Sequence, residues 1–61
     1  MSMSAEEYES KLETLSDATL RLTSHIMSMS REKIIKMIDI IETEDSEENI
    51  VRLLKELKDQ K

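Results

Sequence analysis

The segment REKIIKMIDII, residues 31–41, holds six apolar residues in eleven positions, and five of the six are isoleucine. These apolar residues recur at spacings of three and four, which predicts a helix with an apolar face. The face consists of Ile34, Met37, Ile38 and Ile41. Two more isoleucines flank it, so the helix is apolar over more than half of its circumference. Such a helix belongs at the centre of a bundle, with neighbours on more than one side.

The rest of the composition is typical of a helical protein. The chain has 61 residues, with no glycine, proline or cysteine and a single aromatic residue. It is rich in leucine, glutamate, lysine and methionine, which favour helices. We therefore predict an all-α fold in one small domain over residues 1–61. A chain this short buries a low fraction of its surface, so we expect its apolar faces to be shared with a second chain.

A long first helix is predicted over residues 5–29. Ser4 is placed to cap it, and residues 1–4 are expected to fray. Apolar residues then recur at alternating spacings of three and four, as in a heptad seam. Thr19 is the one polar member of this seam; it is interpreted either as setting the register of the helix or, more simply, as a tolerated threonine. The seam consists of Ala5, Tyr8, Leu12, Leu15, Thr19, Leu22, Ile26 and Met29.

Two shorter helices are predicted after it, over residues 31–42 and 47–59. Ser30 is the expected N-cap of the first. The acidic segment that joins them, ETEDSEEN, is predicted to be a solvated turn that ends in a helix start, with Asp45 or Ser46 as the cap. Three lysines near the end of the last helix lie where the helix dipole favours cations.

Helix lengths favour a homodimer. At about 1.5 Å per residue the first helix spans roughly 38 Å and the others roughly 18–20 Å each, so the first overshoots a compact monomer. The shorter helices can fold back along it, but the isoleucine-rich helix then has more apolar surface than one neighbour covers. A two-fold homodimer is the simplest closed arrangement. The predicted dimer interface consists of Leu15, Leu22, Ile26, Ile34, Ile35, Ile38 and Ile41.

The remaining apolar surface, rimmed by acidic side chains, is expected to dock on a protein partner. The net charge of −5 favours a partner with a basic or apolar docking surface, such as the DNA-binding face of a transcription factor. The same charge disfavours direct binding of nucleic acid. The candidate partner contacts are Leu20, Met27, Ile50 and Leu54.

The sequence shows no motif for catalysis, a cofactor or a metal. His25 is the only histidine, and it is interpreted either as a pH sensor or, more simply, as a surface residue. The acidic run lacks the residue order of a calcium-binding loop. We therefore expect a protein that is not an enzyme and that uses no cofactor or metal. The polar, acidic start and the short apolar stretches predict a cytoplasmic protein without a membrane span.

From Leu15 onward the chain resembles the YmgB/AriR family of small two-component-system connector proteins, which is linked to biofilm formation and acid resistance. The resemblance is carried by LSDATLRL (15–22), MSREKIIKMIDIIET (29–43) and IVRLLKEL (50–57). The family tends to show a Leu-Gly start, where this chain has Leu15 and Ser16. The resemblance implies a non-enzymatic helical homodimer that adjusts stress or surface-attachment gene expression through protein contacts.

These observations predict a small regulatory protein that acts by stoichiometric contact with a bacterial transcription factor or signalling protein, in stress, biofilm or virulence gene expression. Two alternatives remain open. One is a helical chaperone or antitoxin-like subunit that folds on its partner. The other is weak DNA binding by a dimer through a basic strip formed by Arg21, Arg31, Lys33 and Lys36.

Overall fold

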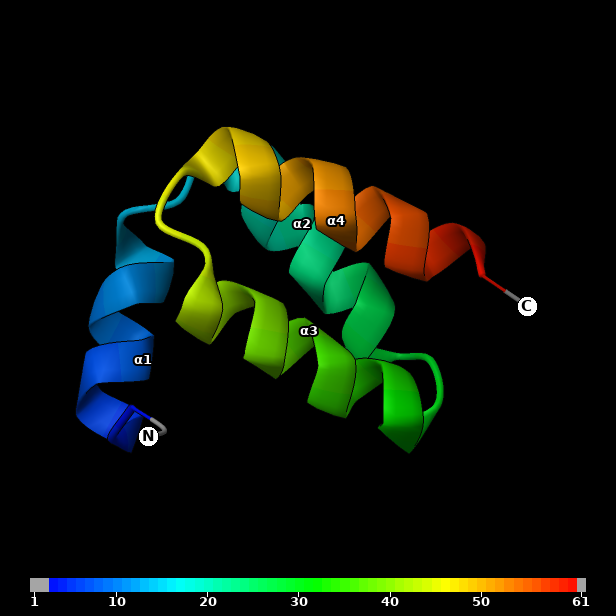
Figure 1. The fold of residues 1–61 in the computed structure, drawn as a ribbon, viewed down its shortest axis with the longest axis horizontal. Coiled ribbons are helices and arrows are strands. Elements are labelled where there is room, and N and C mark those ends of the chain that lie inside the picture. The colour runs from blue at the N-terminus through cyan, green and yellow to red at the C-terminus, as the bar shows by residue number, and fades with distance from the viewer. Residues whose placement is uncertain (1–2, 61) are drawn as a thin grey trace.

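The fold is an arrangement of α-helices in a computed structural model that describes residues 3–60. Helices α2, α3 and α4 pack against one another around a common core, and α1 packs against α3 (Figure 1). No strand occurs in residues 3–60, so the all-α class is confirmed. The described residues form four helices, which are α1 (Ala5–Glu13), α2 (Asp17–Met27), α3 (Arg31–Thr43) and α4 (Glu47–Asp59).

A serine hydroxyl caps the start of each described helix. Its oxygen accepts the backbone N–H of the residue three positions further on, at 3.2–3.3 Å, which satisfies one of the N–H groups that a helix start leaves without a partner. The predicted caps Ser4 and Ser30 are confirmed. Of the two residues considered for the last helix, Ser46 is the cap. The fourth cap is Ser16.

The prediction of three helices is wrong, because residues 5–29 form two helices rather than one. α1 ends at Glu13, and the Thr14 hydroxyl donates a hydrogen bond to the Lys11 carbonyl at 2.6 Å. Ser16 then caps α2. Hydroxyl side chains that bond to the nearby backbone compete with continued helix, and two of them act within three residues here. Leu15, in the turn between the helices, is still buried.

The other helix bounds agree closely with prediction. The helix expected over 31–42 is Arg31–Thr43, and the one expected over 47–59 is Glu47–Asp59. The fraying expected for residues 1–4 falls partly on residues 1 and 2, which lie outside the described part of the chain. Within it, the Met3 backbone N–H donates to Glu42 Oε2 at 3.0 Å.

The hydrophobic core closes within one chain. Ile26, Ile41 and Leu54 have no exposed surface, and the described chain measures 30 × 22 × 17 Å. The long first helix that overshot a monomer does not exist, so helix length no longer argues for a homodimer. The buried apolar residues are Leu15, Ile26, Met37, Ile41, Ile50, Leu54 and Leu57.

The isoleucine-rich segment contributes to both the core and the surface. Met37 and Ile41 face the core and are 1% and 0% exposed. Ile34 and Ile38 are half-buried, whereas Ile35 is 59% exposed. The segment therefore covers most of its apolar surface inside the single chain and leaves one side of α3 uncovered.

A polar network joins the starts of α2 and α4. The Thr19 hydroxyl donates to Glu47 Oε2 at 2.7 Å, and the Ser16 backbone N–H donates to the same oxygen at 3.1 Å. Thr19 is only 2% exposed, so the carboxylate of Glu47 satisfies a buried hydroxyl as well as the start of α2. These hydrogen bonds lower the pKa of Glu47 below its ordinary value of 4.5, those from the Ser16 and Thr19 side chains most.

Two lysines connect other helix ends. Lys11 Nζ donates to the Glu44 carbonyl at 2.7 Å, which links α1 to the turn after α3. Lys33 Nζ donates to the carbonyls of Lys58 and Gln60, at the end of α4. Both ammonium groups satisfy carbonyls that the helix ends leave without an intrahelical partner. Across the described residues, no helix is long and apolar enough to cross a membrane.

Candidate functional site

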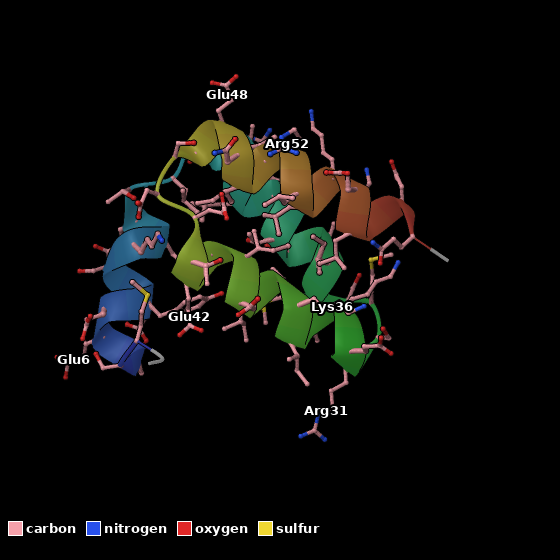
Figure 2. All side chains as sticks on the ribbon, viewed as in Figure 1. Glu6, Arg31, Lys36, Glu42, Glu48 and Arg52 are labelled. Carbon is pink, nitrogen blue, oxygen red and sulfur yellow. The ribbon has the colours of Figure 1, made fainter. Side chains whose placement is uncertain are left out.

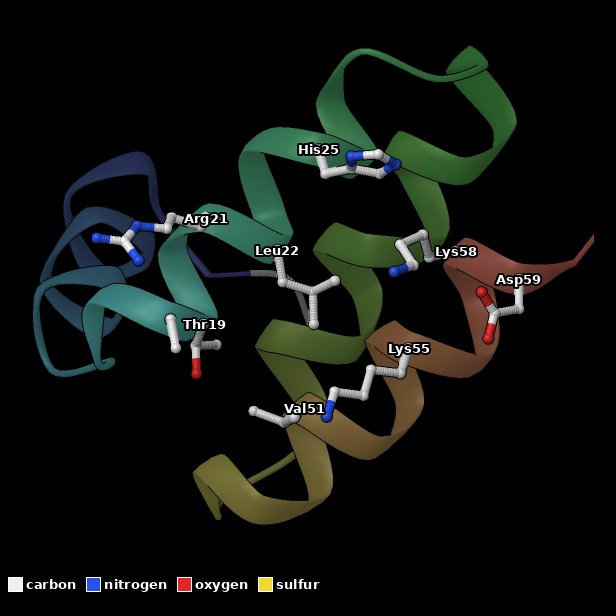
Figure 3. A pocket seen from close by; sticks show the side chains of 9 residues that line it. Thr19, Arg21, Leu22, His25, Val51, Lys55, Lys58 and Asp59 are labelled. Atoms are coloured by element: carbon white, nitrogen blue, oxygen red, sulfur yellow. The ribbon is translucent and has the colours of Figure 1, made fainter.

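A groove of about 410 Å³ lies between α2 and α4. The hydrogen bond between Thr19 and Glu47 joins these two helices at one end. Figure 3 shows Leu22 extending from α2 toward α4, with Lys55 reaching back from α4. We call this the α2–α4 groove. It is lined by Ala18, Thr19, Arg21, Leu22, His25, Val51, Lys55, Lys58 and Asp59.

The lining of the α2–α4 groove is basic, although the whole chain carries a net charge of −5. Lys55 and Lys58 come from successive turns of α4, and Arg21 lies at the rim, where its guanidinium extends away from α4 (Figure 3). Asp59 is the one acidic residue in the lining. The ion pairs among the described residues, Lys36 with Glu32 and Arg52 with Glu56, lie outside it.

The groove also has an apolar floor. Leu22 and Val51 are half-buried and line it from opposite helices. Long lysine side chains lay their methylene groups along such a floor and keep the charged ends at the rim. The arrangement therefore suits a segment with apolar side chains on one face and carboxylates beside them.

A second, apolar hollow of about 300 Å³ lies where α1, α2 and α3 meet. Met27 stands at its edge with 58% of its surface exposed. Glu9 is the only charged residue in the lining, so this hollow offers contact area and little electrostatic selection. It is lined by Tyr8, Glu9, Leu12, Thr23, Met27, Ile34, Met37 and Ile38.

The residues predicted for the dimer interface fall into separate environments. Leu15, Ile26 and Ile41 are buried in the core of the single chain, at 8%, 0% and 0% exposed. The fold therefore corrects their assignment, because they leave little or no surface for a second copy. Leu22 lines the α2–α4 groove. The three that reach the outer surface come from one helix, and they are Ile34, Ile35 and Ile38.

The predicted partner contacts divide in the same way. Ile50 and Leu54 are 1% and 0% exposed. Both residues lie on the side of α4 that faces the core. Their assignment as partner contacts is therefore corrected. Leu20 is half-buried, and Met27 is exposed at the apolar hollow. Only these last two present surface to another molecule.

The basic strip considered for DNA is divided by the fold. Arg21 lies at the rim of the α2–α4 groove, Lys33 bonds to the end of α4, and Lys36 pairs with Glu32 at 3.3 Å. Arg31 extends outward from the start of α3 (Figure 2). The four cations therefore do not form one continuous surface.

Sequence reasoning missed the α2–α4 groove because its two walls lie far apart along the chain. Lys55 and Lys58 are two of the three lysines interpreted from the sequence only as favourable charges near a helix end. The spacing of three positions places the two lysines near one another on α4, and this was the one sequence feature that could have indicated a basic site. Nothing in the sequence of α4 identifies Leu22 and His25 as the residues across from them.

No group of three or more histidine, cysteine, aspartate or glutamate residues comes together as a possible metal site in the described range 3–60. His25 lines one end of the α2–α4 groove and is exposed.

Comparisons of the chain with protein-family models, with curated proteins and with solved structures found no match in any of the three. The resemblance to the YmgB/AriR family stays a prediction.

Proposed function

We propose that the chain is a small non-enzymatic regulatory protein of the bacterial cytoplasm that acts by stoichiometric contact with a protein partner. The partner is a transcription factor or signalling protein in stress, biofilm or virulence gene expression, as the resemblance to the YmgB/AriR family implies. The regulatory protein acts as a homodimer. The α2–α4 groove is its partner site, and the occupant is an acidic, amphipathic helical segment.

The observation that carries this proposal is the lining of the groove. Lys55 and Lys58 stand beside an apolar floor made by Leu22 and Val51. Complementary charge selects partners and raises the rate of encounter more than it adds affinity. A groove between two helices also matches the way in which amphipathic helices are recognised, through apolar residues on one face.

The proposal reverses the charge expected for the partner. The overall net charge favours a basic docking surface on the partner, but the lysines beside the groove floor, Lys55 and Lys58, favour an acidic one. Asp59 is the one acidic residue in the lining, and the other acidic residues of the described chain lie outside the groove. The local charge of a site governs recognition at short range, because screening weakens contributions beyond about 8–10 Å at moderate ionic strength.

The alternative of a subunit that folds only on its partner has less support. Seven apolar side chains are buried within the single chain, and no buried polar side-chain atom of the described residues lacks a hydrogen bond. DNA binding has less support too, because the fold separates the basic residues that would contact phosphates.

The proposal is tested by NMR titration of the ¹⁵N-labelled protein with a synthetic acidic amphipathic helix. We expect amide shifts at Leu22, Val51 and Lys55, and no binding of a peptide in which every carboxylate is replaced by lysine. The double variant Lys55→Gln/Lys58→Gln should weaken binding on the order of tenfold.

The matched control is Lys36→Gln/Arg52→Gln, which removes the same charge from exposed positions outside the groove. Equal loss of binding in both double variants would mean that binding depends only on net charge, and it would contradict the α2–α4 groove as the partner site. Affinity capture from a bacterial host with the same two variants then tests whether a transcription or signalling protein is retained through the groove.

A further inference from the structure

One side of α3 carries a cation, two isoleucines and an anion, in that order along the helix. The four residues are separated by four, three and four positions, so they share one face of the helix. We call this face the outer stripe of α3. It consists of Arg31, Ile35, Ile38 and Glu42.

The outer stripe is open to a partner. Ile35 is 59% exposed, Arg31 is exposed, and Ile38 and Glu42 are half-buried. Figure 2 shows Arg31 near the start of α3, extending away from the other helices, and Glu42 near the opposite end. An isoleucine this exposed between two charged groups gains by contact with another apolar surface.

We propose that the outer stripe is the homodimer contact, with two copies of α3 packed antiparallel about a two-fold axis through the middle of the stripe. This inference rests on the homodimer in the proposed function and names its interface. In this register Arg31 of each copy lies opposite Glu42 of the other. Ile35 of each copy lies opposite Ile38 of the other. A stripe with this order of charges is therefore complementary to itself, as a two-fold interface requires.

The charges decide between the two possible directions of pairing. In a parallel pair, Arg31 faces Arg31 and Glu42 faces Glu42, which repels at both ends. In the antiparallel pair both contacts attract, and the dipoles of the two helices run in opposite directions. The Glu42 carboxylate also has capacity left. Its Oε2 accepts the Met3 N–H, and no described residue donates to Oε1.

The apolar hollow between α1, α2 and α3 extends this contact. Ile38 belongs both to the outer stripe and to the lining of the hollow. Ile35 of the second copy, opposite Ile38, therefore reaches the edge of the hollow beside Met27 and Ile34. Two short helices bury less than about 1,200 Å² in total, which is the size of a weak, reversible complex.

Charge reversal tests the register. The single variants Arg31→Glu and Glu42→Arg each turn both end contacts from attraction to repulsion, and we expect each to weaken dimerisation on the order of tenfold. The double variant Arg31→Glu/Glu42→Arg restores complementarity and should recover the dimer. The measurement is sedimentation velocity over a concentration series into the hundreds of micromolar, with circular dichroism to show that each variant stays helical.

Mixing separates antiparallel from parallel pairing. Wild type and the double variant repel each other in the antiparallel register and attract each other in the parallel one. Native mass spectrometry with one species ¹⁵N-labelled should therefore find the two homodimers and few mixed dimers. A majority of mixed dimers overturns the antiparallel register.

Further outcomes settle the role of the stripe. The matched control Arg52→Glu, on the exposed side of α4, should leave dimerisation unchanged. Single reversals on α3 that do not weaken the dimer, or a wild type that stays monomeric throughout, overturn the inference. Peptide binding in the α2–α4 groove is measured separately and is complete within one chain, so its result tests the proposed function independently.

Discussion

Thr19 donates its hydroxyl proton to the Glu47 carboxylate at 2.7 Å, across the junction of α2 and α4. Ser16 Oγ lies 3.1 Å from Thr19 Oγ1, and the Ser16 backbone N–H donates to the same Glu47 oxygen at 3.1 Å. The cap of α2 and the first turn of α4 are therefore one hydrogen-bonded unit. A polar residue inside the apolar face of α2 thereby has a structural role.

Replacing Thr19 by valine removes this hydroxyl and keeps the side-chain shape. Thr19→Val should lower the free energy of unfolding by about 1 kcal/mol, because one hydrogen bond to a charged acceptor is lost. Urea denaturation followed by circular dichroism measures the change. The control Thr43→Val removes an exposed hydroxyl that bonds only to nearby backbone carbonyls, and should change stability by less than about 0.5 kcal/mol. Equal effects from the two variants would contradict the structural role of Thr19.

The lowered pKa of Glu47 predicts a dependence of stability on pH. A carboxyl whose pKa is lower in the folded chain stabilises the fold above its unfolded pKa, near 4.5, and loses that contribution as pH falls through the folded value. Wild type should therefore melt at a higher temperature than Glu47→Gln at neutral pH, and the difference should shrink below about pH 4.5. Thermal melts across a pH series test this. Glu48→Gln, one position further along α4, is the control. A difference in melting temperature between wild type and Glu47→Gln that stays constant with pH would contradict a lowered pKa for Glu47 in the folded chain.

Ile41 and Ile35 provide a test of which side of α3 faces the core. Ile41→Ala leaves a cavity at a site with no exposed surface and should cost about 2–5 kcal/mol. Ile35→Ala changes an exposed residue and should cost less than about 0.5 kcal/mol in the monomer. Chemical denaturation at a protein concentration too low for dimerisation measures the change in unfolding free energy for both variants. Comparable losses would mean that α3 is rotated relative to the structure described here.

Tyr8 is the only tyrosine, so its ionisation is observed without interference. Burial raises its pKa above 10.0, and the nearby charge of Glu42 raises it further. The contribution of Tyr8 to stability is therefore fully present below its unfolded pKa, near 10, and is lost as pH rises through the higher folded pKa. Absorbance at the phenolate band should show a titration midpoint above pH 10 that returns toward 10 in urea. Glu42→Gln should lower the midpoint in the folded chain, and a midpoint unmoved by both changes would contradict this environment for Tyr8.

The sequence predicted those helices whose ends are marked by a strong local signal. Ser30 before REKIIKMIDII and the acidic turn ending at Ser46 fixed α3 and α4 within a residue or two, because capping and apolar spacing agree there. The break at Ser16 was missed because the spacing of Leu12, Leu15 and Thr19 continues through the turn. The helix is interrupted there by hydroxyl groups that hydrogen-bond to the nearby backbone. A search for glycine and proline does not detect such a break.

The candidate site was less predictable than the fold. Burial of Ile50 and Leu54 depends on how α2, α3 and α4 pack together, and apolar spacing alone does not say which face of a helix stays open. The α2–α4 groove depends on residues more than thirty positions apart, as with Leu22 and Lys55. The outer stripe of α3 could have been identified from the sequence, because its four residues are close together on one helix. That the stripe is exposed could be seen only in the folded structure.

No residue in the described range has a positive φ angle, and every turn is made from conformations available to any L-amino acid. The connections between helices therefore impose almost no steric demand on which side chains occupy them. Substitutions of the exposed turn residues should therefore be tolerated, provided that a hydroxyl or a similar acceptor starts each helix and that the buried Leu15 stays apolar. A protein built in this way can diverge far in sequence while its architecture persists.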